Sequence, residues 1–240
     1  MIVLLLYFAL NIYVFRIVDL RQHSGSDTLI NFAPRFLLLT VALCLVCWLK
    51  GERSRWQWGK RIEDVFDVLR RGGIAVLATD TTYGIVGSAR KERTVSEIYR
   101  LRKRDLNKPL IVLIADISDL KKFGIVLTSK QNKMLHMVWP GPVSAILPCS
   151  HEKFSYLHRG IGTLAFRLPE KESLRRLIRE VGPLVAPSAN PQGHPVARTI
   201  SEASAYFGHH VDFYQDSGTI VALPSKLIDI TGDMEKVLRS

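Results

Sequence analysis

The stretch "GGIAVLATDTTYG", residues 72–84, predicts a helix end, a buried strand and a polar strand end in succession. Apolar residues at helical spacing over residues 62–69 precede it, and its two glycines end that helix. The apolar run at residues 74–79 is typical of a buried strand. The polar residues 79–84 follow at the carboxyl end of this strand, where ligands bind in open α/β sheets. Its threonines either orient a small polar substrate or form an ordinary turn.

Strand and helix patterns alternate along the rest of the chain. Apolar runs predict strands at residues 110–114, 143–148, 163–169, 184–186, 211–216 and 225–230. Helical patterns lie between them at residues 95–104, 130–138, 174–181 and 200–208. Thr94 and Glu97 have capping-box spacing, "WPGP" ends the second of these helices, and Gly182 ends the third. The alternation predicts an α/β or α+β domain built on a sheet.

The chain has 240 residues and a formal net charge of +11, from 33 Lys and Arg against 22 Asp and Glu. Its length suits one domain plus an appendage. The excess of cations favours nucleotides, nucleic acids or anionic lipid headgroups as partners, although a basic domain without such a partner has the same composition. Three cysteines do not make a disulfide framework. Cys44 and Cys47 have CxxC spacing but lie in an apolar run, so we expect small buried hydrophobes and a reducing, cytoplasmic compartment.

Residues 1–55 differ in composition from residues 60–240 and form a hydrophobic N-terminal extension. Its two apolar runs, "MIVLLLYFALNIYVF" and "FLLLTVALCLVCWL", are each shorter than the roughly 20 residues that span a bilayer as a helix. A basic cluster at residues 50–61 would keep the following domain in the cytoplasm. Three interpretations stay open: a membrane anchor or hairpin with membrane contact through residues 1–50, a helical appendage packed on the domain, or non-native sequence upstream of the true start.

Several general catalytic and metal-binding motifs are missing from the sequence. It has no GxxxxGK[ST] phosphate loop, no HExxH, no paired CxxC and no GxSxG. "GIGTLA", residues 160–165, fits GxGxxA, but its glycines precede a strand instead of following one, so we reject a dinucleotide site. The His209–His210 pair is typical of a solvated turn. We therefore expect no dedicated metal ligands.

Cations stand at two places where the predicted elements end. Arg102, Arg104 and Lys108 lie at the end of a helix and in the loop after it. Cations are favourable at a helix carboxyl end, but arginine also binds phosphate at two points, and three cations suit a triphosphate. Arg167 interrupts the apolar strand "TLAFRLP", where a charge is costly unless it is paired. Its partner is either an internal carboxylate or that of a bound substrate.

The loop "PLVAPSANPQGHP", residues 183–195, places Ser188 and Asn190 between prolines directly after an apolar strand. Prolines restrict backbone angles, so we expect a pre-shaped loop. Its hydroxyl and amide groups either hold a ligand or bond to their own backbone as in an ordinary turn.

Five blocks in the same order make the chain resemble one family, the YrdC-type threonylcarbamoyl-AMP synthases in their short, single-domain form. The blocks are "GGIAVLATDTTYGIVG", "IYRLRKRDLNKPLIVLIA", "WPGPVSAILP", "GTLAFRLP" and "PLVAPSANPQGHPVART". The resemblance covers about residue 60 to the end, and residues 1–55 have no counterpart in the family's domain. Each block alone is a weak signal, whereas all five in sequence are specific.

The resemblance implies an α/β fold in which a twisted mixed sheet with flanking helices surrounds a basic cavity. It implies an enzyme, a nucleotidyltransferase that joins L-threonine, bicarbonate and ATP, with Mg²⁺, to give threonylcarbamoyl-AMP and pyrophosphate. The product would feed a threonylcarbamoyl-transfer complex that modifies certain tRNAs, and tRNA is a further expected ligand. The catalytic domain, residues 60–240, would be cytoplasmic.

The resemblance also implies roles for individual residues. Arg102 and Arg104 would be catalytic, and Mg²⁺ would enter with ATP near Ser188 and Asn190. Threonine would be bound by Thr81, Arg167 and Ser225. ATP would be bound by Arg102, Arg104, Lys108, Thr163, Ser188, Asn190 and Arg239.

The chain departs from the family pattern at three positions. Arg102 stands where the family has lysine, Asp105 where a proline is common, and Leu113 where longer relatives have a histidine. Arginine keeps the charge but changes its reach and geometry. Two rival functions use the same fold: a non-catalytic RNA-binding module, and the carbamoyl-adenylate chemistry of carbamoyltransferase maturation proteins.

Overall fold

The structure is a computed structural model of the chain, and it describes residues 65–232 and 234–239. The hydrophobic extension expected at residues 1–55, with its proposed membrane contact and its two cysteines, lies outside these residues. The first residues of the helix expected at 62–69 also lie outside them. Among the described residues, no helix combines the length and the apolar character that crossing a bilayer requires.

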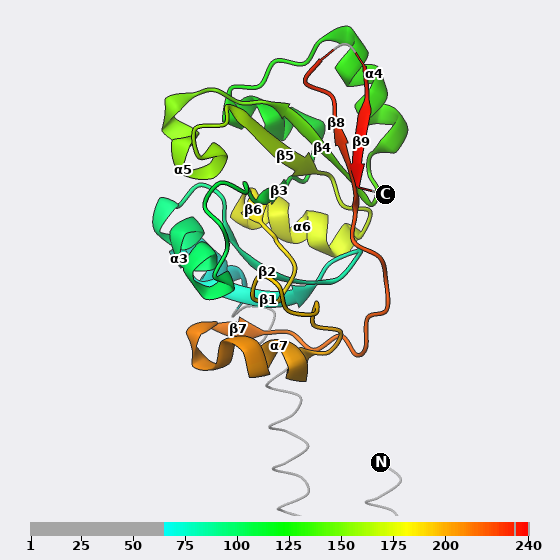
Figure 1. The fold of residues 1–240 in the computed structure, drawn as a ribbon. Helices are drawn as coiled ribbons and strands as arrows, with labels where there is room; N and C mark the ends of the chain where they lie inside the picture. Colours follow the sequence, from blue (N-terminus) through cyan, green and yellow to red (C-terminus); the bar gives the residue numbers. More distant parts are fainter. Residues whose placement is uncertain (1–64, 233, 240) are drawn as a thin grey trace, which may run out of the picture. The chain divides into compact units, whose positions relative to one another are not determined.

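The described residues form one mixed sheet of nine strands in the order β7-β1-β2-β6-β3-β5-β4-β8-β9 (Figure 1). The strands are β1 (Ile74–Ala78), β2 (Tyr83–Ser88), β3 (Ile111–Leu113), β4 (Val143–Pro148), β5 (Thr163–Arg167), β6 (Leu184–Val185), β7 (Phe213–Tyr214), β8 (Lys226–Asp229) and β9 (Lys236–Arg239). Three neighbouring pairs are parallel, β1 with β7, β3 with β5 and β4 with β8, and the other pairs are antiparallel. The predicted α/β sheet is therefore confirmed.

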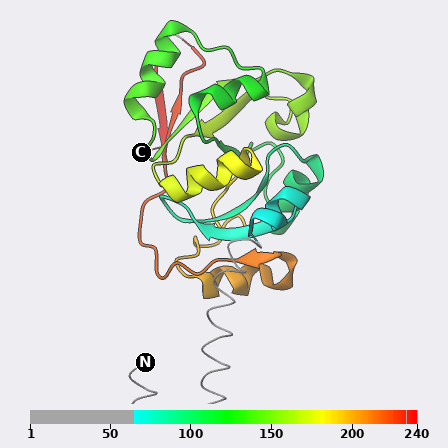
Figure 2. The same ribbon diagram turned by 180° about the vertical axis from the view of Figure 1, so that it is seen from behind.

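Helices cover both faces of this sheet. They are α3 (Glu92–Arg102), α4 (Ser129–Val138), α5 (Ser155–His158), α6 (Glu172–Val181) and α7 (Ile200–Phe207), with 3-10 turns η1 (Ile117–Phe123), η2 (Glu152–Phe154) and η3 (Gly208–His210). Seen from behind, α6 and the helical residues 65–71 lie over the sheet on that side (Figure 2). The other helices pack largely on the opposite face, where the larger of two hydrophobic cores lies.

The residues of β1 alternate between the two cores because successive side chains of a strand point to opposite faces. Val76 and Ala78 belong to the larger core with Ile98 of α3. Ala75 and Leu77 belong to the smaller core, which also contains three residues of α6. All five residues of β1 are buried, which explains why the sequence here is continuously apolar and not alternating.

Two strands were not expected from the sequence, and the predicted helix cap was wrong. β2, "YGIVGS", is fully buried although it contains two glycines, and β9 is an exposed edge strand. The helix predicted at residues 95–104 begins at Glu92, and its N-cap residue Lys91 makes no side-chain cap. The Thr94 hydroxyl instead donates to the carbonyl of Gly72 over 2.7 Å, so it joins α3 to the turn before β1.

Gly87 of β2 has no room for a side chain under α3. A Cβ at this position would lie 2.4 Å from Cγ2 of Thr94 and 3.1 Å from Cδ1 of Ile98. We expect Gly87→Ala to lower the free energy of unfolding by about 1–3 kcal/mol, the usual cost of overpacking a core. Urea unfolding measures this change. Gly232→Ala is the matched control, since its Cβ would meet nothing within 4 Å, and equal stability of both variants would contradict the prediction.

Candidate functional site

Arg102, the last residue of α3, holds the loop that carries Ser188 and Asn190. Its side chain is buried, and its Nε donates to the Asn190 carbonyl over 2.9 Å. Its Nη2 donates to Ser188 Oγ and to Asn190 Oδ1, each over 3.2 Å. Ser188 Oγ donates to Asn190 Oδ1 over 2.7 Å, which completes the network. Residues predicted separately from two motifs thus form one cluster.

The same loop is fixed by its own backbone and by β2. Asn190 Nδ2 donates to the carbonyls of Pro191 and His194, over 3.0 and 2.8 Å. The amide of Ile85 donates to the Pro187 carbonyl, and that of Ala189 donates to the Tyr83 carbonyl. The polar segment after β1 and the Ser188 loop therefore lie side by side, and the loop is held by hydrogen bonds as well as by its prolines.

Burial, and secondarily the charge of Arg104, lower the pKa of Arg102 to about 10. The guanidinium remains charged at neutral pH, since its pKa still lies well above 7. A buried cation that donates to neutral oxygens is favourable only if those hydrogen bonds persist. Arg102 therefore positions the Ser188 loop, and its predicted contact with phosphate stays a prediction.

Arg104 organises the loop between α3 and β3. Its Nε donates to the Lys108 carbonyl over 2.8 Å, and its Nη2 donates to the Pro109 carbonyl over 3.1 Å. The Tyr99 hydroxyl donates to the same Lys108 carbonyl over 3.2 Å. The Lys108 side chain is exposed. Burial lowers the pKa of Arg104, the charges of Tyr99 and Asp105 raise it, and repulsion from Arg239 lowers it.

Arg167, at the carboxyl end of β5, meets an internal carboxylate, which answers the question that its sequence raised. Its Nη2 lies 3.1 Å from Asp80 Oδ1, and the two side chains are 5% and 7% exposed. The two groups form an ion pair at this distance, but their geometry is not that of a hydrogen bond, and Asp80 Oδ1 has no hydrogen-bond partner. Nη1 donates to Thr81 Oγ1 over 3.0 Å. Burial lowers the pKa of Arg167, while Asp80 raises it and Arg239 lowers it.

Arg239 lies on β9, the edge strand at one end of the sheet, and binds Ser225, the residue before β8. Its Nε and Nη2 donate to the Ser225 carbonyl over 3.0 and 2.7 Å, and Nη2 donates to Ser225 Oγ over 3.2 Å. The Ser225 and Ser144 hydroxyls lie 2.9 Å apart in a buried pair. Burial lowers the pKa of Arg239. Repulsion from Arg239 lowers the pKa of both Arg104 and Arg167, so its charge is close enough to act on each of them.

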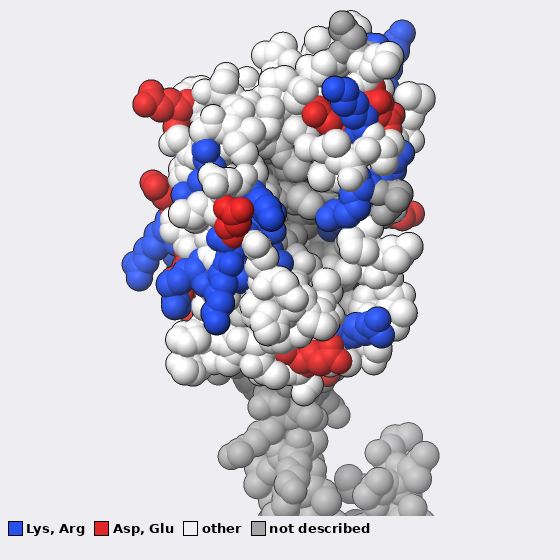
Figure 3. All heavy atoms as spheres, viewed as in Figure 1, with Lys and Arg blue, Asp and Glu red and all other residues white. Residues whose placement is uncertain are grey.

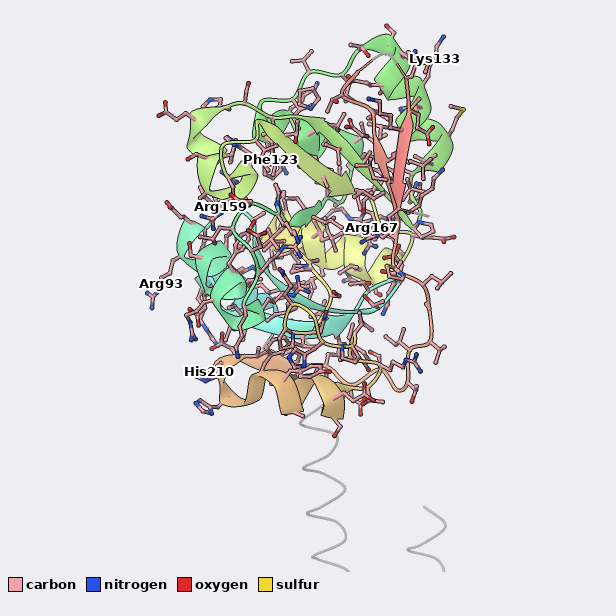
Figure 4. All side chains as sticks on the ribbon, viewed as in Figure 1. Arg93, Phe123, Lys133, Arg159, Arg167 and His210 are labelled. Carbon is pink, nitrogen blue, oxygen red and sulfur yellow. The ribbon has the colours of Figure 1, made fainter. Side chains whose placement is uncertain are left out.

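We call the four side chains Arg102, Arg104, Arg167 and Arg239 the arginine cleft. Figure 3 shows a hollow on this face of the molecule with Lys and Arg side chains on both sides of it. Figure 4 shows Arg167 at the end of β5 near the centre of the same view. These cations repel one another, and each of them has lost part of its hydration. A bound anion would offset both costs, so the cleft favours anionic ligands.

Two predicted residues fit the cleft less directly. Thr163 begins β5 and lies on the same face of that strand as Arg167, but four residues away, about 13 Å along a strand. It pairs in register with Pro148 of β4. Leu113 pairs in register with Arg167 and is buried in the smaller core against α6. Leu113, one of the three expected departures from the family pattern, is thus part of the packing here.

The structure adds residues that sequence reasoning missed. Asp80 and Ser144 touch Arg167 and Ser225 directly, and both lie inside blocks that the sequence analysis had quoted. The side-chain oxygen Oε1 of Gln192 accepts a hydrogen bond from the backbone amide of Asp105 over 3.0 Å. The backbone amide of Gln192 donates to the Arg102 carbonyl over 2.7 Å. A proline at position 105 has no amide to donate, so this departure ties the two loops together.

The described residues contain no group of three or more His, Cys, Asp and Glu side chains that could bind a metal ion. Asn190 Oδ1 already accepts from Arg102 and from Ser188. A magnesium ion near this loop would therefore need ligands from a bound phosphate, which is how Mg²⁺ commonly binds with nucleotides. A separate depression of about 430 Å³, lined by Phe66, Asp67, Arg70, Arg176 and Glu180, shares no residue with the arginine cleft.

Known proteins resemble this chain in sequence over most of the described residues. A model of the Sua5, YciO and YrdC proteins, described as "Telomere recombination", matches residues 67–240. The chain is 31% identical over 175 residues to threonylcarbamoyl-AMP synthase of Bacillus subtilis, covering 72% of this chain and 51% of the relative. It is 35% identical over 161 residues to the enzyme of the same name from Idiomarina loihiensis, covering 65% and 87%.

Solved structures agree. Sua5 of Pyrococcus abyssi in complex with L-threonine superposes with a TM-score of 0.69 at 28% identity, covering 76% of this chain and 54% of that one. YciO of Escherichia coli, at 21% identity and a TM-score of 0.67, shows the likeness of fold. The chain thus spans about half the length of the Bacillus relative and of the Pyrococcus structure.

Proposed function

The chain belongs to the Sua5/YciO/YrdC family, and from that premise we propose that it is a threonylcarbamoyl-AMP synthase. The reaction takes L-threonine, bicarbonate and ATP and yields threonylcarbamoyl-AMP and pyrophosphate, which makes the protein a nucleotidyltransferase. The observation that carries the proposal is the arginine cleft, in which Arg167 is buried beside Asp80 and Thr81, and Arg104 holds the loop that carries Lys108. Such a cleft suits one ligand with a single carboxylate and a second with several phosphates.

Threonine binds through its carboxylate to Arg167, with Thr81 and Ser225 beside it. Arg167 has five N–H donors, of which the structure gives one hydrogen bond to Thr81, so donors remain for a ligand. The Pyrococcus relative was solved with L-threonine, which supports an amino-acid site in this fold. ATP binds with its phosphates toward Arg104 and Lys108, and toward the Ser188 loop that Arg102 holds.

The chemistry needs little covalent work from the protein. The threonine amine takes up the carbon of bicarbonate, water leaves, and the resulting carbamate oxygen attacks the α-phosphorus of ATP. The bond from that phosphorus to the bridging oxygen breaks, and pyrophosphate departs with the electron pair. Arg104, Arg239 and Lys108 neutralise the charge that develops on the phosphate oxygens, while the held loops keep the reactants in line. Magnesium bound to the phosphates would add charge neutralisation there.

A release assay for pyrophosphate tests this proposal with the full chain. ATP and Mg²⁺ are supplied, and threonine and bicarbonate are each left out in turn. We expect release only when both are present, because the carbamate must form before the phosphorus is attacked. Release that does not depend on threonine would exclude the proposed reaction.

The rival function is a non-catalytic RNA-binding module, which would behave differently in the same experiment. It gives no pyrophosphate release, and an affinity for RNA that falls steeply with salt. The tRNA-modifying complex that would consume the product, and tRNA binding by this chain, stay proposals that rest on the reaction itself.

A further inference from the structure

Asp80 is a buried carboxylate in the arginine cleft to which the mechanism above gives no role. Its side chain is 7% exposed, and Oδ1 lies 3.1 Å from Arg167 Nη2 without any hydrogen bond. Oδ2 accepts only a long hydrogen bond, 3.3 Å, from the amide of Glu170. Burying a carboxylate is costly, and replacing a buried ion pair by apolar residues is often neutral or stabilising. Fold stability alone is therefore a poor reason for this residue.

The four arginines of the cleft differ in whether a carboxylate or a neutral oxygen is their partner. Within residues 65–232 and 234–239, the ion pair between Arg167 and Asp80 is the only one that any of the four arginines makes. The partners of Arg102, Arg104 and Arg239 are neutral carbonyl, hydroxyl and amide oxygens. Asp105 is close enough for its charge to raise the pKa of Arg104, but the other three arginines still outnumber it. One end of the cleft is therefore nearly neutral, and the rest keeps a net positive charge.

We propose that Asp80 sorts the two anionic substrates between the ends of the arginine cleft, an inference that rests on the proposed function. The repulsion between Asp80 and a ligand grows in proportion to the ligand's charge. The attraction of Arg167 grows in the same proportion, so the pair gives a polyphosphate almost no net attraction, whereas the other three arginines keep theirs. Arg167 still offers its remaining N–H donors, so it selects a carboxylate by hydrogen bonding, and polyphosphate is drawn to the other arginines instead.

The surroundings hold Asp80 in place for this role. The Thr79 hydroxyl accepts from the amides of Thr81 and Thr82, each over 3.2 Å, and donates to the Thr82 carbonyl over 2.8 Å. Lys171 Nζ donates to the Ala78 carbonyl over 3.1 Å on the other side. The turn after β1 is thereby braced, and Asp80 and Thr81 contact different nitrogens of one guanidinium. Asp80 is thus a positioning and selecting residue that acts through Arg167.

Competition for the threonine site tests the proposal with the full chain. Threonine binding is measured by calorimetry without ATP, in the absence and presence of pyrophosphate. In the unsubstituted protein we expect pyrophosphate to leave the Kd of threonine unchanged. In Asp80→Asn we expect pyrophosphate to compete and to raise the apparent Kd roughly tenfold, the change expected when one charge interaction of moderate strength is removed. Asp67→Asn is the control for net charge, because Asp67 lies in the helical residues 65–71, its side chain is 66% exposed, and it makes no contact with the four arginines in any ion pair of the described residues.

A second measurement needs no variant and covers the case in which Asp80→Asn fails to fold. In the unsubstituted protein, 3-hydroxybutyrate, a monocarboxylate without the amine, should displace threonine, and pyrophosphate at equal concentration should not. Displacement by both, or unchanged threonine binding in Asp80→Asn with pyrophosphate, would overturn the sorting role alone. If the unsubstituted protein does not bind threonine at all, both the proposed function and this inference fail.

Discussion

Arg104→Ala is expected to lower the turnover number by about 10²–10³-fold, the loss typical of removing one group that stabilises transition-state charge. Arg104 is half-buried, and this burial lowers its pKa, so the charge of an approaching phosphate would offset the loss of hydration of the guanidinium. The same substitution removes two hydrogen bonds to the carbonyls of Lys108 and Pro109. We therefore also expect a loss of stability of about 1–3 kcal/mol.

The measurement is steady-state release of pyrophosphate under saturating ATP, threonine and bicarbonate, with circular dichroism to confirm the fold. Arg104→Lys is the matched control, because it keeps the positive charge but cannot donate to two carbonyls in the same way. It should retain more of the turnover than Arg104→Ala does. A folded Arg104→Ala variant with near-normal turnover would show that the residue serves only the loop.

Arg102→Ala is expected to destabilise the domain by about 3 kcal/mol or more, because three acceptors, two of them in buried hydrogen bonds, then lose a charged donor. These acceptors are the Asn190 carbonyl, Asn190 Oδ1 and Ser188 Oγ. The loop that they belong to would lose its link to α3, so the KM for ATP should rise more strongly than kcat falls. Urea unfolding and ATP-dependent rates measure the two effects separately.

Arg102→Lys distinguishes the charge of this residue from its geometry. Lysine is the residue that the family resemblance implies here, but its single ammonium cannot match the spread of contacts that the guanidinium makes. We expect an intermediate stability between Arg102 and Arg102→Ala. Equal stability of Arg102→Ala and the unsubstituted protein would show that the network does not hold the loop.

Much of the fold could be predicted because its signals are local. The buried run of β1, the helix that ends at Val138 before "WPGP", and the glycine that ends α6 all follow from short stretches of sequence. β2 escaped prediction because its glycines have low strand propensity, and the tertiary reason for Gly87 is the helix packed above it. The capping box at Thr94 failed because the helix begins earlier, at Glu92, so that Thr94 lies inside its first turn and its hydroxyl donates to the carbonyl of Gly72 instead.

The candidate site shows the same division. The sequence by itself determined the residue types, namely arginines at element ends, a proline-bounded Ser and Asn loop, and a charged residue in a strand that had to find a carboxylate. Only the tertiary structure decided that Asp80 is this carboxylate, that Arg102 holds Asn190 from 88 positions away, and that Arg239 binds Ser225. The physical reason is that burial and charge specify what kind of partner a side chain needs, whereas strand register and sheet order specify which residue stands within reach.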